Sequence, residues 1–347
     1  MNDNKKTAKS VRWQKIGLSI LCVFLALVLL VMIFATAFLE YAENRYLDKI
    51  NRVDINNEET NPSIPTDPTD PDFTGPVKDP TDVEHNTVPP DQITDSNSDG
   101  LINILLVGQD RRPGQGRQRS DSMILCSFNV EKGTISMTSF LRDTYVYIPG
   151  WGSEKLNAAY AHGGFKLLYE TLAVNFGVSV DAGVEVDFSG FKQIIDLLGG
   201  VDISLTQKEV DHLNKWYKFN LSVGPNHLNG EQALAYSRIR KIDMDAMRAQ
   251  RQRTVLLALI DKYKSKSISE MLDILDDVLP MVTTTMSNQE IINYAVDLFP
   301  MLSNTEIKTQ QIPAAGTYTE MTVGSVTATK VADMEVNRQI LKDLLGN

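Results

Sequence analysis

Arginine side chains gather in two groups that lie far apart in the sequence. Ten of the 14 arginines fall between positions 111 and 253. The first group is Arg111, Arg112, Arg117, Arg119 and Arg142, and the second is Arg238, Arg240, Arg248, Arg251 and Arg253. A guanidinium group binds phosphate oxygens in pairs and stays charged when it is desolvated. The two groups therefore favour a polyanionic ligand, although a basic surface with internal salt bridges has the same composition.

Aspartates are interleaved with these arginines. Asp110 comes just after a short apolar run, Asp121 begins another, and Asp143 follows Arg142. In α/β sheets, ligands bind at the carboxyl ends of strands, and Mg²⁺ is often held there by one or two carboxylates together with substrate phosphates. Asp110 and Asp121 are therefore candidate Mg²⁺ ligands. Asp143 is a candidate base, an indirect metal ligand or an orienting partner for Arg142, and a simple local ion pair or turn gives the same pattern.

Spacing places several of these residues on shared faces. Arg238 and Arg240 are two positions apart, so they point the same way if that stretch is extended. Asp245, Arg248 and Gln252 are three and four apart, so they line one face of a helix whose later part reads VLLALI. A polar end that leads to an apolar end suits a charged headgroup with an apolar tail. A core helix with one solvated end has the same pattern.

The composition narrows the class of partner. The chain has 347 residues, a formal net charge of −10 and a pI of about 5.0. An acidic chain without a helix-turn-helix pattern is not expected to bind nucleic acid.

Cys22 and Cys126 have no evident pairing, so no structural disulfide is expected. The histidines are scattered and make no zinc site: His85, His162, His212 and His227.

An uninterrupted apolar segment at residues 16–39 follows a basic stretch at residues 1–15. Roughly 20 apolar residues cross the hydrocarbon core of a bilayer. The positive-inside rule then makes residues 1–15 a cytoplasmic tail and places the rest of the chain outside. We therefore predict a single-pass protein of the cell membrane. A cleaved signal peptide is the alternative, but its apolar core is usually about 7–15 residues long.

Residues 40–99 are predicted to be an extracellular linker. Residues 51–99 are rich in Pro, Asp, Asn and Thr and poor in large apolar side chains. Such a stretch buries too little surface to offset the entropy of ordering it. We expect a disordered tether that holds a domain at residues 100–347 away from the bilayer.

From residue 101 onward, strand and helix patterns alternate. Apolar runs predict strands at 101–108, 122–130, 134–140, 144–149, 184–188, 201–205 and 307–312. Helical spacing covers 163–176, 191–198, 244–264, 268–278, 288–301 and 334–345. This alternation predicts an α/β domain with helices packed on a sheet.

Five segments carry a resemblance to a known family. They are NILLVGQDRR, RSDSMIL, SFLRDTYVYIPGWGSEKLNAAYAHGG, VDFSGFKQIIDLLGGVDI and LNGEQALAYSRIRKIDMDAMRAQRQR. In this order they resemble the motifs of the LytR-CpsA-Psr family, also called the cell envelope-related transcriptional attenuator domain. The resemblance covers about residues 101–265, and residues 266–347 look like the C-terminal completion of that domain. At 244–248 the chain reads Met-Asp-Ala-Met-Arg where the family often has Gly-Asp-Phe-Gly-Arg.

The resemblance implies a three-layer αβα sandwich with a central mixed sheet and an apolar pocket for a polyprenyl chain. It also implies a Mg²⁺-dependent phosphotransferase of cell-wall biogenesis. Such an enzyme moves a phosphate-linked glycopolymer, for example teichoic acid or capsule, from a polyprenyl-pyrophosphate carrier to peptidoglycan. The alternatives are a pyrophosphatase, a non-catalytic binder of the same lipid, and an envelope-linked transcriptional regulator.

The motifs also assign roles to individual residues. Asp110 and Asp121 fall on the metal-associated aspartates. The residues implied to bind the pyrophosphate substrate are Arg119, Lys155, Arg238, Arg240, Arg248 and Gln252. Arg142, Asp143 and Asp245 are the implied catalytic residues. Either aspartate of this last set could accept the proton of the attacking hydroxyl.

Overall fold

The structure is a computed structural model that describes residues 45–58, 87–93, 100–111, 116–240, 242–264, 268–323 and 326–346. The chain divides into two units, Met1–Lys49 and Ile50–Asn347. Of the first unit, the described part contains the short 3-10 helix η1 (Leu47–Lys49). The predicted basic tail and membrane span lie outside the described residues. None of the helices in the described ranges is both long enough and apolar enough to cross a membrane.

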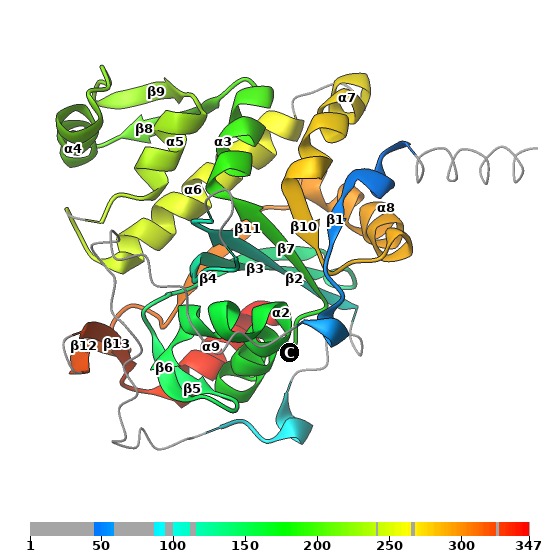
Figure 1. The fold of residues 1–347 in the computed structure, drawn as a ribbon, viewed down its shortest axis with the longest axis vertical. Coiled ribbons are helices and arrows are strands. Elements are labelled where there is room, and N and C mark those ends of the chain that lie inside the picture. Colours follow the sequence, from blue (N-terminus) through cyan, green and yellow to red (C-terminus); the bar gives the residue numbers. More distant parts are fainter. Residues whose placement is uncertain are drawn as a thin grey trace, which may run out of the picture. The chain divides into compact units, whose positions relative to one another are not determined.

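A mixed sheet of seven strands forms the centre of the second unit (Figure 1). The strands, in spatial order, are β1 (Asn51–Arg52), β10 (Val282–Thr284), β7 (Ala182–Asp187), β2 (Leu101–Gln109), β3 (Ser120–Asn129), β4 (Thr134–Phe140) and β11 (Ile307–Ile312). The three consecutive strands β2, β3 and β4 pair antiparallel, whereas β2 pairs parallel with β7 and β4 parallel with β11. The carboxyl ends of β2 and β4 and the start of β3 therefore meet at one edge of the sheet.

Helices cover both faces of this sheet (Figure 1). The helices are α2 (Leu156–Phe176), α3 (Phe188–Leu197), α4 (Gln207–Tyr217), α5 (Gly230–Ser237), α6 (Asp245–Lys264), α7 (Ile268–Val278), α8 (Asn288–Asn304) and α9 (Met334–Leu345). α2 and α9 pack on one face, and α6 and α8 pack on the other. The predicted α/β class, with helices packed on a mixed sheet, is confirmed.

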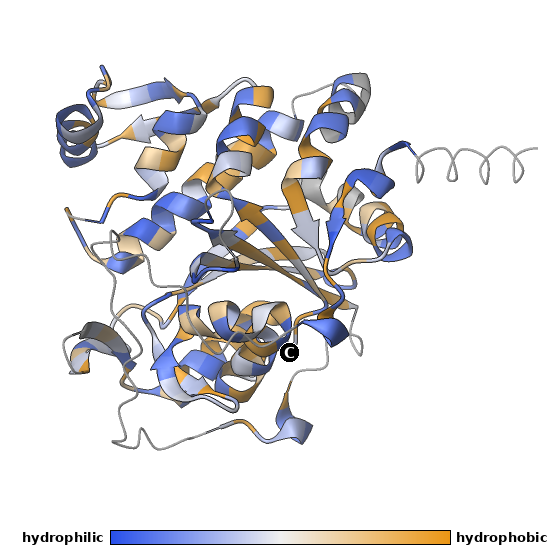
Figure 2. Cartoon of the chain, in the orientation of Figure 1, coloured by the Kyte–Doolittle hydropathy of each residue, from blue (hydrophilic) through white to orange (hydrophobic). Residues whose placement is uncertain are grey.

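The strands alternate their side chains between these two helical layers. Leu105 and Val107 of β2 belong to the core cluster that contains α2 and α9. Ile104 and Leu106 pack against the cluster that includes side chains of α6 and α8. Successive side chains of a strand point to opposite faces, so a continuous apolar run is what a strand between two helical layers requires. Figure 2 shows this concentration of hydrophobic residues in the central strands.

A second core lies beside the sheet. The hairpin of β8 (Val201–Leu205) and β9 (Gly224–Leu228) packs with α3, α4, α5 and part of α6. Two more hairpins lie elsewhere in the fold. One joins β5 (Tyr145–Ile148) to β6 (Gly152–Lys155), and the other joins β12 (Tyr318–Val323) to β13 (Val326–Val331).

Most of the predicted elements are present with bounds shifted by a few residues, and the differences are local. The helix predicted at 163–176 begins at Leu156 instead, and its backbone is non-helical at Gly163 and Gly164. The short strands β6, β9, β10, β12 and β13 were not predicted, nor were α4 and α5. α4 is largely hydrophilic (Figure 2) and is stabilised at its start by a capping box between Thr206 and Glu209.

Part of the predicted linker has regular structure. Asn51–Arg52 form β1 at the edge of the sheet, and two 3-10 helices follow, η2 (Ile55–Asn57) and η3 (Pro90–Gln92). Residues 40–44, 59–86 and 94–99 of the predicted linker lie outside the described ranges.

Two expectations concern cysteine and metal. Cys126 is a free, buried thiol, and burial raises its pKa to about 12. Cys22 lies outside the described residues. Within the described ranges, no group of three or more His, Cys, Asp or Glu residues could hold a metal ion.

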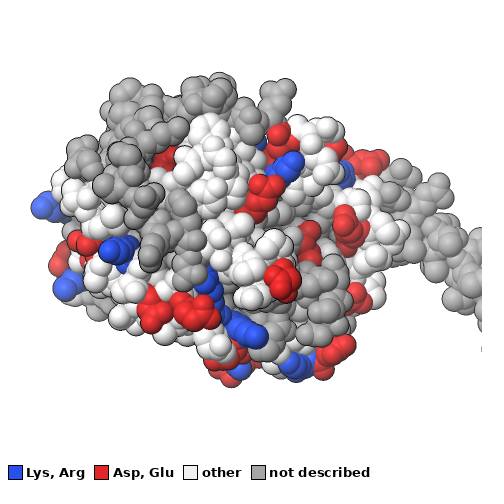
Figure 3. Space-filling model, turned by 90° about the horizontal axis from the view of Figure 1, so that it is seen from below, with Lys and Arg blue, Asp and Glu red and all other residues white. Residues whose placement is uncertain are grey.

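Acidic and basic side chains are interspersed among uncharged ones on the face seen in Figure 3. Two arginines of the sequence-predicted site, by contrast, are buried. Arg142 is 8% exposed and Arg248 is 2% exposed. These guanidinium groups are therefore not part of a solvated basic face.

Candidate functional site

The carboxylate of Asp121 is the centre of an arginine cluster. Its Oδ1 atom lies 2.7 Å from Arg142 Nη1, 3.0 Å from Arg240 Nη2 and 3.3 Å from Arg248 Nη2. Gln252 Nε2 donates to the backbone oxygen of Asp121 at 3.4 Å. Burial alone would raise the pKa of Asp121, but the charges of Arg248 and Arg142 outweigh it and hold that pKa below its ordinary value.

The members of this cluster come from separate parts of the chain. Asp121 lies at the start of β3, and Arg142 follows the end of β4. Arg240 lies in the loop between α5 and α6, and Arg248 lies in the first turns of α6. The strands supply one side of the cluster and α6 the other, because α6 packs against β3 and β4 near the edge where these strands begin and end.

Arg142 joins this cluster to a second set of charges. Its Nε atom lies 3.6 Å from Asp143 Oδ2 and 3.7 Å from Asp245 Oδ1. Lys155, at the end of β6, places its Nζ atom 2.9 Å from Asp143 Oδ1. Burial would lower the pKa of Arg142, but the carboxylates around it, led by Asp143 and Asp121, raise it. Arg142 therefore stays charged in its buried position.

Arg248 is the most deeply buried cation of the site. Only 2% of the residue is exposed, and burial lowers its pKa more than the neighbouring carboxylates raise it. Among the described residues, its Nη2 atom has only the ion-pair contact with Asp121 Oδ1 at 3.3 Å, and no acceptor forms a hydrogen bond with its Nε atom. Buried donors without acceptors are energetically costly, so an anion that reaches these atoms would be bound favourably.

Arg238 and Asp110 form a neighbouring ion pair. Arg238 caps the end of α5, and its Nη2 atom lies 3.3 Å from Asp110 Oδ2. The guanidinium carbon of Arg238 lies 4.5 Å from the centre of the Phe188 ring. The face of an aromatic ring attracts a cation at this distance, so Phe188 helps to orient Arg238.

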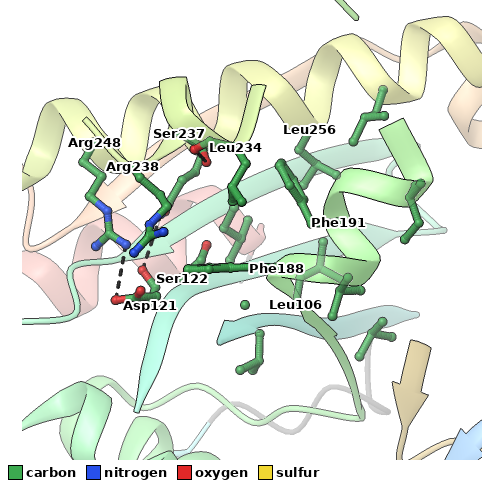
Figure 4. Close-up of a pocket in the computed structure, with 18 residues that line it drawn as sticks. Leu106, Asp121, Ser122, Phe188, Phe191, Leu234, Ser237, Arg238, Arg248 and Leu256 are labelled. Atoms are coloured by element: carbon green, nitrogen blue, oxygen red, sulfur yellow. Dashed lines mark hydrogen bonds and ion pairs between the residues drawn. The ribbon is translucent and has the colours of Figure 1, made fainter. Parts of the chain in front are cut away.

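A cavity of about 230 Å³ extends from these charges into the domain (Figure 4). Its polar end contains Asp121, Ser122, Ser237, Arg238, Arg248 and Gln252. The rest is lined mainly by apolar residues, which are Leu106, Val107, Gly108, Ile124, Val184, Val186, Phe188, Phe191, Ile194, Leu234, Leu256 and Leu259. In Figure 4, Asp121 and Arg248 lie at one end, and Phe191 and Leu256 lie toward the other. The cavity therefore suits a ligand with an anionic head and an apolar tail.

Most of the sequence-predicted residues come together in these two connected groups. Asp121, Arg142, Arg240, Arg248 and Gln252 form the first group. Asp143, Lys155 and Asp245 join it through Arg142. Asp245 and Arg248 share one face of α6 as predicted, because Arg248 Nη1 lies 3.7 Å from Asp245 Oδ1. The roles assigned to these residues remain predictions.

Other arginines of the two groups bind elsewhere. Arg111 pairs with Glu185 (3.3 Å) and Arg117 with Glu58 (3.2 Å). Arg251 is buried and bonds to Glu209 (2.7 Å) and to Asp243. These three arginines therefore form internal salt bridges, which is the alternative interpretation of the arginine pattern.

Arg119 is also paired away from Asp121. Its Nη2 atom donates to Glu154 Oε1 at 3.0 Å, and Glu154 Oε2 lies 2.9 Å from His162 Nε2. The His162 ring stacks on Trp151, with ring centres 3.8 Å apart. Glu154 and His162 were not singled out from the sequence, because their link to Arg119 depends on contacts between β6, α2 and the start of β3.

The profile of the LytR_cpsA_psr family matches residues 74–341. The chain belongs to the LytR_cpsA_psr family. Among known proteins, the polyisoprenyl-teichoic acid–peptidoglycan teichoic acid transferase TagT of Bacillus subtilis (strain 168) is 36% identical over 210 residues. This alignment covers 58% of the present chain and 64% of TagT, which is less than two thirds of that relative's length.

Solved structures of this family have the same fold. TagT bound to LIIa-WTA gives a TM-score of 0.60 at 32% sequence identity, with 73% of this chain and 94% of that chain covered. TagT with bound octaprenyl pyrophosphate lipid gives a TM-score of 0.57 at 29% identity, with 76% and 97% covered. This family member therefore has a TagT-like α/β domain.

The oxygen donors at this family member's site are compatible with Mg²⁺. All three arginine contacts of the Asp121 carboxylate are made by Oδ1, so Oδ2 is not engaged in them. Asp110 is a second carboxylate, and it pairs with Arg238, which lines the cavity. Mg²⁺ is commonly bound through one or two carboxylates plus substrate phosphates, so these two carboxylates are donors of the type that Mg²⁺ uses.

Asp121 should make this family member sensitive to acid. A carboxyl group whose pKa is lower in the folded state contributes stability above its unfolded value of about 3.9, and this contribution is lost as pH falls through the folded value. Asp121→Asn should lower the unfolding free energy at pH 7 by on the order of 3 kcal/mol. Its stability should also fall less steeply than that of the wild type below pH 4. Denaturant unfolding at pH 2–7 measures both effects.

The control for this prediction is Asp211→Asn, at an exposed position on α4. It should leave both the free energy and its pH dependence unchanged. If Asp121→Asn followed the wild-type curve below pH 4, the lowered pKa of Asp121 would be wrong.

Glu154 should hold Arg119 through a coupled ion pair. Glu154→Gln removes the charge that Arg119 and His162 share, so the unfolding free energy should fall by about 1–3 kcal/mol. In an Arg119→Met background the same change should cost clearly less, since residues in direct contact couple by about 0.5–3 kcal/mol. Thermal unfolding of the four proteins of this double-mutant cycle measures the coupling. Additive effects of the two substitutions would contradict it, and Glu170→Gln, at an exposed position on α2, is the control.

Proposed function

We propose that this protein is a cell-wall glycopolymer phosphotransferase. In this proposal it moves a phosphate-linked glycan from a polyprenyl-pyrophosphate carrier to peptidoglycan. The observation that carries the proposal is the apolar cavity that ends at arginines, of which the buried Arg248 has a donor, Nε, without an acceptor among the described residues. A pyrophosphate on a long hydrocarbon chain matches both ends of that cavity.

The charge balance at the polar end supports an anionic ligand. Arg142, Arg240, Arg248 and Lys155 contribute four positive charges around the three carboxylates Asp121, Asp143 and Asp245. The surplus is positive inside a chain whose net charge is −10. Arginine forks bind phosphate oxygens in pairs, so an entering pyrophosphate would exchange contacts with carboxylates for contacts with its own oxygens.

The relatives support the chemical class. TagT is named as a transferase of teichoic acid to peptidoglycan, and its solved structures hold LIIa-WTA or octaprenyl pyrophosphate lipid. Because this chain is 36% identical to TagT and has the same fold, we propose the same class of donor and acceptor for it. The site does not identify the glycan, because in this proposal the cavity and the arginines contact the carrier part of the donor.

The proposed reaction is one in-line displacement at phosphorus. A hydroxyl oxygen of peptidoglycan forms a bond to the phosphorus that carries the glycan, and the bond from that phosphorus to the bridging oxygen breaks. Polyprenyl phosphate leaves with the electron pair of the broken bond. Arg142, Arg240 and Arg248 are placed to neutralise the charge that grows on the leaving phosphate. The apolar wall keeps the tail in position during the step.

The attacking hydroxyl must lose its proton to a nearby base. Both oxygens of Asp143 are engaged, Oδ1 with Lys155 at 2.9 Å and Oδ2 with Arg142 at 3.6 Å. Burial would raise the pKa of Asp143, but Arg142 and Lys155 outweigh it and lower that pKa. Among the described residues, Asp245 has ion-pair contacts of 3.7 Å with Arg142 and Arg248, both through Oδ1. We therefore assign the proton acceptor to Asp245 and the orientation of Arg142 to Asp143.

Mg²⁺ is part of the proposal. Asp110 and Asp121 would hold it together with pyrophosphate oxygens, where its charge would stabilise the leaving phosphate. The proposed location follows from the sequence. Residues 16–39 would anchor the chain in the cell membrane as a single span, with residues 1–15 in the cytoplasm and the catalytic domain outside.

The decisive experiment measures transfer by the full chain in detergent. The donor is a polyprenyl-pyrophosphate-linked glycan, and the acceptor is a peptidoglycan fragment. We expect glycan on the acceptor and released polyprenyl phosphate, with both lost when EDTA is added. Arg142→Ala should lower kcat by about 10²–10³, the usual cost of losing one donor to a developing oxyanion. Arg338→Ala, on α9, is the matched control and should keep its activity.

Other outcomes of this assay select the alternatives. Cleavage of the donor without any glycan on the acceptor would favour a pyrophosphatase. Tight binding of the donor without turnover would favour a non-catalytic lipid-binding protein. An envelope-linked transcriptional regulator would then be the next hypothesis to test. Full transfer by Arg142→Ala would contradict the proposed role of the arginine cluster.

Filling the cavity should separate recognition of the tail from recognition of the head. Leu234 lines the cavity (Figure 4). Leu234→Trp should weaken binding of polyprenyl pyrophosphate at least tenfold, because a buried CH₂ group contributes about 0.8 kcal/mol and the bulky ring displaces several of them. Binding of inorganic pyrophosphate should not change. Calorimetry with both ligands measures the difference, and Val296→Trp, at a position 67% exposed on α8, is the control.

A further inference from the structure

The start of the predicted linker belongs to the fold of the domain. Asn51 and Arg52 pair in parallel with Thr283 and Thr284 of β10, and Val53 N donates to Thr284 O at 3.0 Å. These bonds make β1 the last strand of the sheet on that side. The chain is thus attached to the domain almost fifty residues before β2 begins.

Side chains of this segment reinforce the attachment. Asn51 Nδ2 donates to Pro280 O at 2.9 Å, and Arg52 Nε donates to Met286 O at 3.2 Å. Arg52 also bonds to the side chain of Asn288 at the start of α8. Farther along, Ile55 packs against the core cluster that contains α2. The segment therefore has polar contacts to the sheet edge and an apolar contact to the core.

Glu58 attaches the end of the segment to α2 through a buried side chain. Only 4% of its side chain is exposed. Its Oε1 atom lies 3.2 Å from Arg117 Nη1, and its Oε2 atom accepts a hydrogen bond from Lys166 N at 2.9 Å. Because α2 is non-helical at Gly163 and Gly164, the amide of Lys166 lies in the first turn of the second half of the helix. Glu58 satisfies a donor that has no partner inside that half.

The break in α2 has the shape that Glu58 needs. Gly164 has a φ of +63°, which side chains of L-residues rarely adopt. A Cβ atom at that position would lie 1.9 Å from Glu58 Oε1 and 2.6 Å from Arg117 Nη1. The glycine therefore gives the carboxylate and the guanidinium group the space in which they meet.

We propose that residues 50–58 form a strap that fixes the chain to the catalytic domain before the Pro-rich segment begins. The chain is fixed again on the far side of that segment. There, Val88 is buried and its amide donates to Val174 O of α2 at 2.7 Å. Residues 59–86 thus begin and end on the same domain. They are an insertion in the domain and not the tether that the sequence predicts.

The strap changes the length of the connection to the membrane. If residues 16–39 are the membrane span, only residues 40–50 link it to the domain. Part of this connection is the 3-10 helix η1, so its reach is roughly 35 Å at about 3.4 Å per extended residue and about 2 Å per 3-10 residue. A tether that included forty further residues could extend on the order of 120 Å more. If the span is correct, the strap would remove residues 51–99 from the connection between the membrane and the domain.

A cross-link across the strap tests its position in the full chain. Asn51→Cys and Thr283→Cys, in a Cys22→Ser background, place thiols on paired positions of β1 and β10. A protease site is placed at residues 65–71. After mild oxidation and cleavage, we expect one full-length band on a non-reducing gel and two fragments after reduction. Two separate fragments before reduction would overturn the strap.

Matched variants test what holds the strap in place. Replacing Thr283→Cys by Val296→Cys, at an exposed position on α8, measures random collision and should give little cross-link. Glu58→Ala should slow formation of the disulfide several-fold, whereas Glu170→Ala, on the exposed side of α2, should not. Equal rates in these two variants would overturn the role of Glu58. The readout needs neither transfer activity nor a membrane, so it is independent of the proposed function.

Discussion

The ion cluster around Asp121 is the constraint on which the rest of the site depends. Three guanidinium groups converge on one carboxylate oxygen, and two of their residues, Arg142 and Arg248, are almost fully buried. Like charges this close are tolerated only when anions lie among them. Asp121, Asp143 and Asp245 supply those anions here. The same balance favours a bound pyrophosphate, which offers more oxygens to the same donors.

The apolar cavity follows from the way the layers pack. On the face of the sheet that α6 covers, β2, β3 and β7 contribute small or branched side chains, and α3 and α5 close the other sides. The polar residues lie where β3 begins, and Arg248 and Gln252 come from the early turns of α6. One helix thus contributes both to the charged end and, through Leu256 and Leu259, to the apolar wall.

A second set of contacts supports the site from the α2 side. Neighbouring residues of β6 point in different directions. Lys155 reaches Asp143, whereas Glu154 reaches Arg119 and His162. The strap adds Glu58 at the break of α2, where it also binds Arg117. Arg117 and Arg119, which follow β2, are thereby linked to α2 through Glu58 and Glu154.

The sequence by itself determined the elements whose pattern is local. The apolar runs of β2, β3 and β4, the helical spacing of α6 and the shared face of Asp245 and Arg248 depend only on neighbouring residues. The family motifs identified the residue types of the site as well. The tertiary structure alone decided which carboxylate each arginine meets. Arg119 pairs with Glu154 and Arg251 with Glu209, while Arg142 meets Asp121. It also decided that residues 51–52 join the sheet, because such partners are set by contacts between distant segments, on which local periodicity carries no information.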